Sequence, residues 1–185
     1  MSTENEKMRG WEVERLLRYR IFSASHILNF STSVLRALVV NHGNNKMFKV
    51  VTNLEDLVKV FIVRGIVFIE EQGVSYNIEH DGHDFSATHI LGEIDGEPFA
   101  AGRIRAVGEY AKLGRVAVRK AYRGKNLGHE LTEFMIAVAK ERGFKKFKVH
   151  AQSYLTDFYQ KHGFEIVGDM FKEAGIDHYL MIRND

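Results

Sequence analysis

The chain has 185 residues, of which 45% are hydrophobic and 27% charged, which is ordinary for a single water-soluble globular domain. Its formal net charge of +2 gives no global field of the kind that a nucleic-acid binder carries, so we expect no nucleic-acid partner. It has no cysteine, which excludes disulfides, thiolate metal sites and a cysteine nucleophile and fits a cytoplasmic protein, and no stretch approaches the ~20 consecutive apolar residues of a membrane span.

The first 45 residues are expected to form a helical extension of the domain that follows. Between Trp11 and Val40 the apolar residues keep a rough helical period, which a serine-rich centre is expected to break into two helices. Residues 42–45, His-Gly-Asn-Asn, are typical of a turn. The amphipathic pattern favours helices packed on the flank of the domain, and it leaves open a lid or an arm that forms a homodimer.

Residues 46–185 alternate between strand and helix periods and predict one α/β domain. A first strand is expected at residues 47–51, followed by a capping box in which Thr52 caps a helix and Glu55 stands three residues on. This amphipathic helix is expected to end near residues 67–72, and residues 76–86 are expected to form a polar loop.

Three further strands are expected to form an antiparallel meander. Residues 88–94 and 99–107 flank the turn dipeptide Asp95-Gly96, which is typical of a hairpin. Glu109 and Tyr110 then turn the chain into a strand around Leu113. The N-terminal part of the sheet is therefore expected to be antiparallel.

A central helix at residues 127–138 separates this meander from a strand at residues 147–151. Because a helix joins them, the two strands are expected to lie parallel in one mixed central sheet flanked by helices. Ser153 is expected to cap a short helix, and residues 164–167 and 178–182 to form the last strands. A ligand site is expected at the carboxyl ends of the parallel strands.

The turn before the central helix combines glycine, positive charge and a helix N-terminus. Residues 123–128 read Arg-Gly-Lys-Asn-Leu-Gly. The first N–H groups of a helix lack partners within the helix and carry partial positive charge, so a phosphate group is a natural ligand there. A nucleoside triphosphate loop is excluded, because Asn126 stands where magnesium binding needs Ser or Thr.

The motif Arg123-x-x-Asn126-x-Gly128 resembles the pyrophosphate loop of the GNAT N-acetyltransferases, whose usual form is Gln/Arg-x-x-Gly-x-Gly/Ala. Asn126 departs from the usual glycine, but asparagine tolerates the left-handed backbone region better than most residues. Further segments occur in the order found in the ElaA-like branch of this family and extend the resemblance to roughly three quarters of the chain. They are residues 68–73, 79–84, 101–105, 151–152, 158–164 and 173–181.

The resemblance implies a GNAT fold and direct transfer of an acyl group from acetyl-CoA to a primary amine of a small molecule or a peptide. Backbone groups of Val116 and Val118 would pair with the pantetheine arm, and an N–H near Val118 would polarise the thioester carbonyl. The implied coenzyme-binding residues are Val116, Ala117, Val118, Arg123, Gly124, Lys125, Asn126, Leu127, Gly128 and His129.

Two residues are implied to transfer protons. Tyr159 lies in the Phe-Tyr-x-x-x-Gly-Phe segment, in which a GNAT tyrosine protonates the leaving thiolate. Glu71 is the first choice for the general base that deprotonates the amine, with Glu70 and His89 as alternatives. Structural roles stay open, for Tyr159 as a packing residue and for Glu71 as a hydrogen-bonded carboxylate at a helix end.

A cluster of acids and histidines has a rival interpretation as a metal site. Glu79, His80, Asp81, His83 and Asp84 include ligand types that bind divalent ions. No second cluster at ligand spacing completes such a site, so we predict no metal. We expect a polar loop that shapes the acceptor cleft.

Arg103 and Arg105 alternate with Ile104 and therefore share one face of a strand. They are expected to bind either an acidic group of the acceptor or an internal carboxylate, of which the second is more common. Two alternatives to an enzyme remain: an acyl-CoA-binding sensor or scaffold without turnover, and a purely structural interaction protein.

Overall fold

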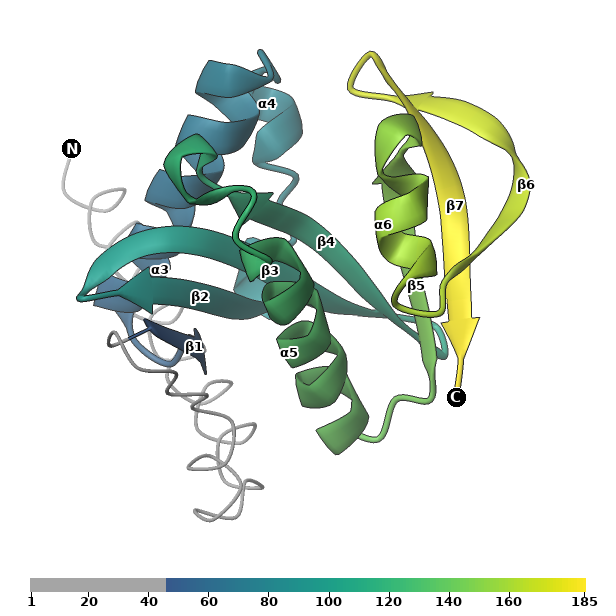
Figure 1. Cartoon of the computed structure of the whole chain (residues 1–185), viewed down its shortest axis with the longest axis horizontal. Coiled ribbons are helices and arrows are strands. Elements are labelled where there is room, and N and C mark those ends of the chain that lie inside the picture. The colour runs from purple at the N-terminus through teal and green to yellow at the C-terminus, as the bar shows by residue number, and fades with distance from the viewer. Residues whose placement is uncertain (1–45) are drawn as a thin grey trace, which may run out of the picture. The chain divides into compact units, whose positions relative to one another are not determined.

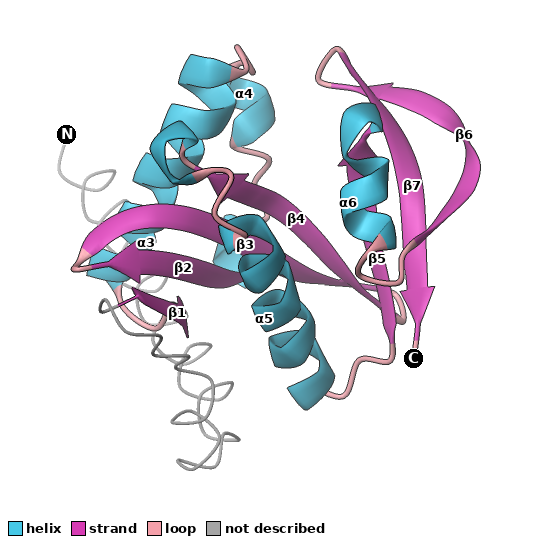
Figure 2. Cartoon of the chain, viewed as in Figure 1, coloured by secondary structure: helices cyan, strands magenta, loops and turns pink. Residues whose placement is uncertain are grey.

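The computed structural model describes residues 46–185, and the expected helical extension lies outside the described residues. In the described part, seven strands form one sheet in the order β1-β2-β3-β4-β5-β7-β6, with helices on both faces (Figure 1, Figure 2). The strands are β1 Lys46–Val50, β2 Thr88–Ile94, β3 Glu97–Val107, β4 Tyr110–Val118, β5 Lys146–Gln152, β6 Glu165–Glu173 and β7 Ile176–Asn184. The helices are α3 Leu54–Arg64, α4 Tyr76–Glu79, α5 Leu127–Glu141 and α6 Thr156–Gln160, with a π-helical segment, Gly65–Glu71, directly after α3.

The sheet confirms the expected mixed topology. Strands β1 to β4 pair antiparallel, and β4 pairs parallel with β5 after the crossover through α5. The hairpin between β2 and β3 turns at Asp95 and Gly96, which both have positive φ (52° and 80°), as a two-residue hairpin turn requires. β6 and β7 are longer than the sequence indicated, and they form a further hairpin beside β5.

Two separate groups of buried side chains cover opposite faces of the sheet. α5 contributes Leu131 to one group, and α3 contributes Val60 to the other. The neighbouring residues Ala100 and Ala101 of β3 belong to different groups, as the alternation of side chains along a strand requires. We call these surfaces the α5 face and the α3 face.

The start of α3 lies one residue later than expected. Asn53, not Thr52, is the N-cap, and its side-chain oxygen accepts a hydrogen bond from the Asp56 backbone N–H (2.8 Å). The Asn53 amide in turn donates to the Asp56 carboxylate (2.9 Å), so Asp56 takes the place expected for Glu55. Asparagine caps helices better than threonine, which explains the shift.

Two other local expectations were wrong. Residues 76–86 are not only loop, because they contain α4 and a single turn of 3-10 helix, Asp84–Ser86. Ser153 does not cap α6 with its side chain, since it begins a short 3-10 turn and its carbonyl accepts a hydrogen bond from the Thr156 hydroxyl (3.3 Å). None of the described helices is both long enough and apolar enough to cross a bilayer.

Candidate active site

The parallel strands β4 and β5 separate halfway along their length. Their pairing ends at Leu113 and Val149, although β4 continues to Val118 and β5 to Gln152 (Figure 1). A bulge in β4 accompanies the separation: Arg115 has positive φ (51°), and the register against β3 shifts by one residue there. Bulges bend a strand and end its pairing, so the bulge at Arg115 accounts for the separation of β4 from β5.

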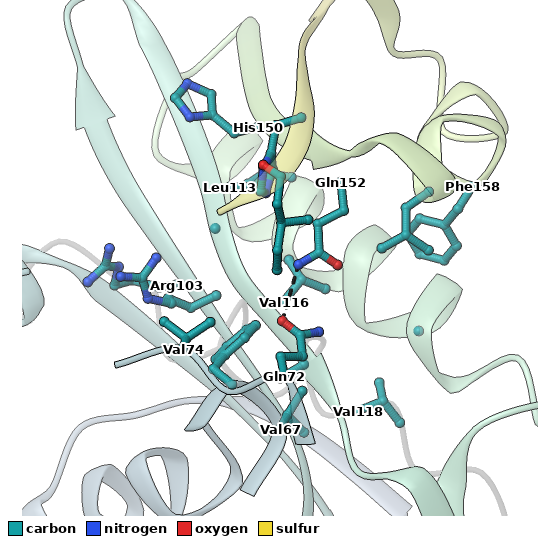
Figure 3. Close-up of a pocket in the computed structure, with 18 of the residues that line it drawn as sticks. Val67, Gln72, Val74, Arg103, Leu113, Val116, Val118, His150, Gln152 and Phe158 are labelled. Atoms are coloured by element: carbon teal, nitrogen blue, oxygen red, sulfur yellow. Dashed lines mark hydrogen bonds between the residues drawn. The ribbon is translucent and has the colours of Figure 1, made fainter. Parts of the chain in front are cut away.

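A cleft of about 830 Å³ occupies this opening and reaches both faces of the sheet. Val67 and Phe68 of the π-helical segment and Gln72, which directly follows it, form one wall. Figure 3 labels Val67 and Gln72. Phe158 and Tyr159 of α6 form part of the opposite wall. The lining of the cleft combines apolar side chains with many charged and polar ones, and a concave site of this size can bury a small molecule.

The free edge of β4 offers backbone hydrogen bonds to the cleft. The Arg119 N–H bonds the Phe99 carbonyl of β3 (2.9 Å), so the backbone of Arg119 faces β3. Backbone directions alternate along a strand, so the N–H and C=O of Val118 and Val116 face away from β3. The Val118 carbonyl indeed accepts from the Arg123 Nε (2.8 Å) on that side.

The turn before α5 presents uncapped N–H groups to the same cleft. Gly124 and Asn126 have positive φ (78° and 63°), which confirms that asparagine here takes the left-handed region. The Asn126 side chain does not cap α5, and the first intrahelical bond runs from the Glu130 N–H to the Asn126 carbonyl (3.1 Å). The first-turn N–H groups are thus available to an anion.

Nearly all residues implied to bind a coenzyme line this cleft. They are Val116, Ala117, Val118, Arg123, Gly124, Asn126, Leu127, Gly128 and His129. Lys125 is the exception, because it is exposed and its Nζ lies 5.8 Å from the centroid of the Tyr122 ring instead.

Tyr159 lines the cleft from α6 and is 6% exposed. Its ring packs edge-on against Phe158 and Phe164, with centroid distances of 5.0 and 5.8 Å. Burial raises the pKa of the Tyr159 phenol, so it favours the neutral hydroxyl over the phenolate. The position suits a proton donor as well as a packing residue.

The carboxylates and the histidine expected as general bases do not line the cleft. Glu71 is held by Arg123, whose Nη2 lies 2.5 Å from the Glu71 Oε2. Glu70 is exposed outside the cleft lining. His89 is buried, with its Nε2 2.9 Å from the Asp84 carbonyl, and burial lowers its pKa.

The acidic loop is tied to the α3 face by arginines. Arg64, which is 1% exposed, lies 2.5 Å from the Glu79 carboxylate and 2.7 Å from that of Asp84. Arg103 bridges the carboxylates of Asp81 (2.5 Å) and Asp84 (2.8 Å). Arg103 therefore binds internal carboxylates, which was the more common of the two expected roles.

Arg115 completes this network with an ion pair to the Glu79 carboxylate (2.5 Å). Burial opposes ionisation, but the bonds from Arg103 hold the pKa of Asp81 well below its usual range. These carboxylates are thus engaged by guanidinium groups, and no group of three or more histidine, aspartate or glutamate side chains in residues 46–185 is arranged to hold a metal ion.

Sequence reasoning missed a polar cluster on the α3 face of the cleft. The Nδ1 of His150 lies 2.5 Å from the Glu173 carboxylate, and the Lys112 Nζ lies 3.2 Å from the same Nδ1. The hydrogen bond with His150, partly offset by burial, lowers the pKa of Glu173 to about 2. One signal was visible: His150 and Gln152 alternate with the buried residues of β5 and therefore share one face.

Gln72 and Gln152 meet across the cleft. The Gln152 amide donates to the Gln72 side-chain oxygen (3.1 Å), as Figure 3 shows. The pair joins the end of the π-helical segment to the end of β5, so it narrows the cleft at the point where the strands have separated.

Comparison with known proteins identifies the family. Residues 66–184 match the family model described as an acetyltransferase (GNAT) domain. The chain belongs to the GNAT acetyltransferase family. Among GNAT relatives, Bacillus subtilis YjcF, an uncharacterized N-acetyltransferase, is 35% identical over 134 residues, 71% of this chain and 95% of the relative. Escherichia coli protein ElaA is 32% identical over 137 residues, 71% of this chain and 89% of ElaA.

Solved GNAT structures share the fold. The crystal structure of Escherichia coli ElaA has a TM-score of 0.69 and 28% identity, and the match covers 75% of this chain and 99% of ElaA. A GNAT acetyltransferase from Elizabethkingia anophelis, solved with acetyl-CoA bound, has a TM-score of 0.57 and 17% identity over 76% of this chain and 99% of that one. The expected resemblance to the ElaA-like branch and the expected GNAT fold are confirmed.

Proposed function

We propose that this chain transfers an acetyl group from acetyl-CoA directly to a primary amine of a small molecule or a peptide. One observation carries the proposal: the unpaired edge of β4 runs into the uncapped N-terminus of α5 within a single cleft. This edge offers strand-like hydrogen bonds to an extended arm, and the helix start offers N–H groups to phosphates.

The residues present fit such a coenzyme. N–H groups at Gly124 to Gly128 would hold the phosphates, with the Arg123 guanidinium beside them. At Gly128 an added Cβ would lie 3.5 Å from the Phe158 ring, so glycine leaves that surface open toward the cleft. The family neighbour that was solved with acetyl-CoA bound supports the same ligand. When bound, the coenzyme supplies a thioester whose C–S bond breaks as the new C–N bond forms.

Two groups of the chain act on the reacting atoms in this proposal. The Val118 N–H, which faces away from β3, would donate to the carbonyl oxygen, a contribution worth about 3 kcal/mol in comparable sites. The Tyr159 hydroxyl would give its proton to the departing sulfur, and the proton that the nitrogen loses as the amide forms would restore the hydroxyl. No covalent enzyme intermediate is needed.

The amine must also lose a proton. An aliphatic amine with a pKa of about 10.4 is protonated at pH 7, and 3.4 units correspond to about 4.6 kcal/mol. His150 is better placed than Glu71 to take this proton, because His150 lines the cleft, whereas Glu71 does not line it and is paired with Arg123. Glu173 would hold the Nδ1–H of His150, so Nε2 is the accepting nitrogen, and the Lys112 Nζ lies 3.4 Å from it.

The alternative proposal is a coenzyme-binding sensor or scaffold that has lost turnover. The two differ in one measurement: release of free thiol from acetyl-CoA when amines are added. Thiol release with at least one amine supports the transferase. Retained coenzyme affinity without thiol release from any amine of a broad library supports the sensor.

The first test is the thermal midpoint with and without acetyl-CoA, with ATP as a control for polyphosphate binding. At about 100 times the dissociation constant, a specific ligand adds ~2.7 kcal/mol, or roughly 5–10 °C for a domain of this size. A shift with acetyl-CoA and little with ATP is the expected result. No shift at millimolar acetyl-CoA would overturn both the transferase and the sensor.

A further inference from the structure

Two cations on the α3 face of the cleft make no ion pair with a carboxylate of residues 46–185. Arg105 of β3 and Lys112 of β4 are direct cross-strand partners, and both line the cleft. Lys148 of β5 is the partner of Lys112 on its other side, which extends the row of like charges to three strands. Like charges directly opposite each other destabilise a sheet, so this row is not explained by stability.

The nearby carboxylates are already engaged. Asp81 and Asp84 bind Arg103, which stands two residues before Arg105 on the same face of β3. Glu173 is hydrogen-bonded to His150. The arginine network on the α3 face is therefore internally compensated, whereas the row that begins at Arg105 is not.

The electrostatics of the two side chains agree with this geometry. Burial, and then the charge of Arg103, lower the pKa of Arg105. Burial lowers the pKa of Lys112, with Glu173 acting only partly in the opposite direction. Both pKa values fall mainly because of burial, and the charges of Asp81 and Asp84 near Arg105 and of Glu173 near Lys112 offset burial only in part, so a bound anion would favour both charged forms.

We propose that Arg105 and Lys112 form an anion-binding subsite, and that the acceptor is therefore an amine that also carries a carboxylate or a phosphate group. The inference rests on the proposed function, because it names the substrate class of the same cleft. Lys112 also contacts His150, so an anionic group bound at Lys112 brings its molecule to the wall that carries the proposed proton acceptor.

The first experiment measures anion binding without turnover. Thermal midpoints are recorded with inorganic phosphate against chloride at equal ionic strength, and coenzyme A is present so that the phosphate sites at α5 are filled. We expect phosphate to raise the midpoint of the parent. The double variant Arg105→Gln/Lys112→Met should bind phosphate at least about tenfold more weakly, the scale of a lost charged hydrogen bond.

A matched control comes from the same row. Lys148→Met removes a neighbouring positive charge from β5, but Lys148 does not line the cleft. This variant should retain the phosphate shift. If Lys148→Met and the double variant lose the phosphate-induced shift of the midpoint equally, phosphate responds only to the net charge of the protein, and the proposed subsite is wrong.

The second experiment tests the substrate class with matched amines. Acetyl transfer to β-alanine is compared with transfer to its amide, and transfer to 2-aminoethyl phosphate with transfer to ethanolamine. The anionic member of at least one pair should have a kcat/KM at least about tenfold higher, and the double variant should abolish that preference. The pair that responds identifies carboxylate or phosphate. Equal kcat/KM within both pairs overturns the inference.

Acetyl-CoA binding of the double variant separates this inference from the proposed function. Neither substituted residue lies at the α5 N-terminus, so the variant should keep the acetyl-CoA shift of the parent. If acetyl-CoA binds and anions do not, only the subsite is wrong. If acetyl-CoA fails to bind while phosphate still depends on Arg105 and Lys112, the proposed function is wrong and the anion site stands. A phosphate shift lost in Arg123→Gln instead would place the anion at the α5 turn and overturn the subsite.

Discussion

On the α5 face of the cleft, positive potential comes from backbone N–H groups, whereas on the α3 face it comes from side chains. Gly124 and Asn126 shape the first within a few consecutive residues. The second brings together Arg105 and Lys112 from two strands, with His150 of a third strand beside Lys112. A backbone site depends on local conformation, while a side-chain site depends on the register of the whole sheet. The two should therefore respond differently to substitution.

The largest expected effect comes from breaking the buried network of the α3 face. Arg64→Met leaves the carboxylates of Glu79 and Asp84 without their buried partner, which should cost about 3–5 kcal/mol and lower the thermal midpoint by roughly 10 °C. Arg119→Met is the matched control, because its ion pair with Glu97 is exposed and should cost at most about 1 kcal/mol. Equal losses in both variants would contradict the structural role of the network.

Tyr159→Phe should lower turnover by about 10²-fold or more while leaving acetyl-CoA affinity within a few-fold, since it removes only the proton donor. Steady-state kinetics and a coenzyme titration measure the two effects. Tyr179→Phe removes a hydroxyl outside the cleft lining and should leave both unchanged. Parental turnover in Tyr159→Phe would reduce Tyr159 to a packing residue.

Gly124→Glu tests the backbone site of the α5 face. No atom lies within 4 Å of a Cβ added there, so the substitution causes no clash, and a carboxylate near the phosphates should weaken acetyl-CoA binding by about tenfold. Gly124→Ala carries the same strain at positive φ without the charge and should have the smaller effect. Calorimetric titration compares them. Unchanged acetyl-CoA affinity in Gly124→Glu would mean that the coenzyme phosphates do not bind at this turn.

Acid should weaken the side-chain cluster selectively. The folded-state pKa of Glu173 is lowered to about 2, below the value of about 4.3 expected in the unfolded chain. The unfolded state therefore binds the proton first, so the stabilisation is present above about pH 4.3 and is lost as the pH falls toward 2. Urea unfolding of the parent and Glu173→Gln should show a difference that shrinks over this range. A constant difference would exclude the ion pair as its source.

The smallest expected effect has the opposite sign. Arg105→Gln or Lys112→Met relieves a like-charge cross-strand contact and should stabilise the ligand-free fold by about 0.2–1 kcal/mol. Chemical unfolding at low ionic strength measures it best, because salt screens the repulsion. Destabilisation by either change would mean that the row has a structural purpose.

Contiguous features of the fold were predictable from the sequence, because each rests on local backbone chemistry. Asp95-Gly96 predicted a hairpin that the structure confirms, and the tolerance of asparagine for positive φ predicted the conformation of Asn126. The helix between β4 and β5 predicted their parallel pairing. Each of these signals extends over a few residues or one element.

The side-chain site was not predictable, because its members meet only through the strand order. His150 and Glu173 stand 23 residues apart on β5 and β6, which are separated in the sheet by β7. No local period encodes that contact. The sequence pattern made Glu71 the first choice for the general base. Its pairing with Arg123, 52 residues away, could be seen only in the folded chain.

Because of the bulge at Arg115, the number of residues in β4 determines which side chains face the cleft. Leu113 and Ala117 would share a face under strict alternation, yet they belong to opposite groups of buried side chains, because one extra residue reverses the frame between them. Deleting one residue at the bulge would move the side chains of Val116 and Val118 to the opposite face of the sheet, although neither residue is substituted. In an alignment of homologous chains, a gap of one position at this bulge therefore indicates that different side chains line the cleft. The same gap in an exposed loop would leave the cleft lining unchanged.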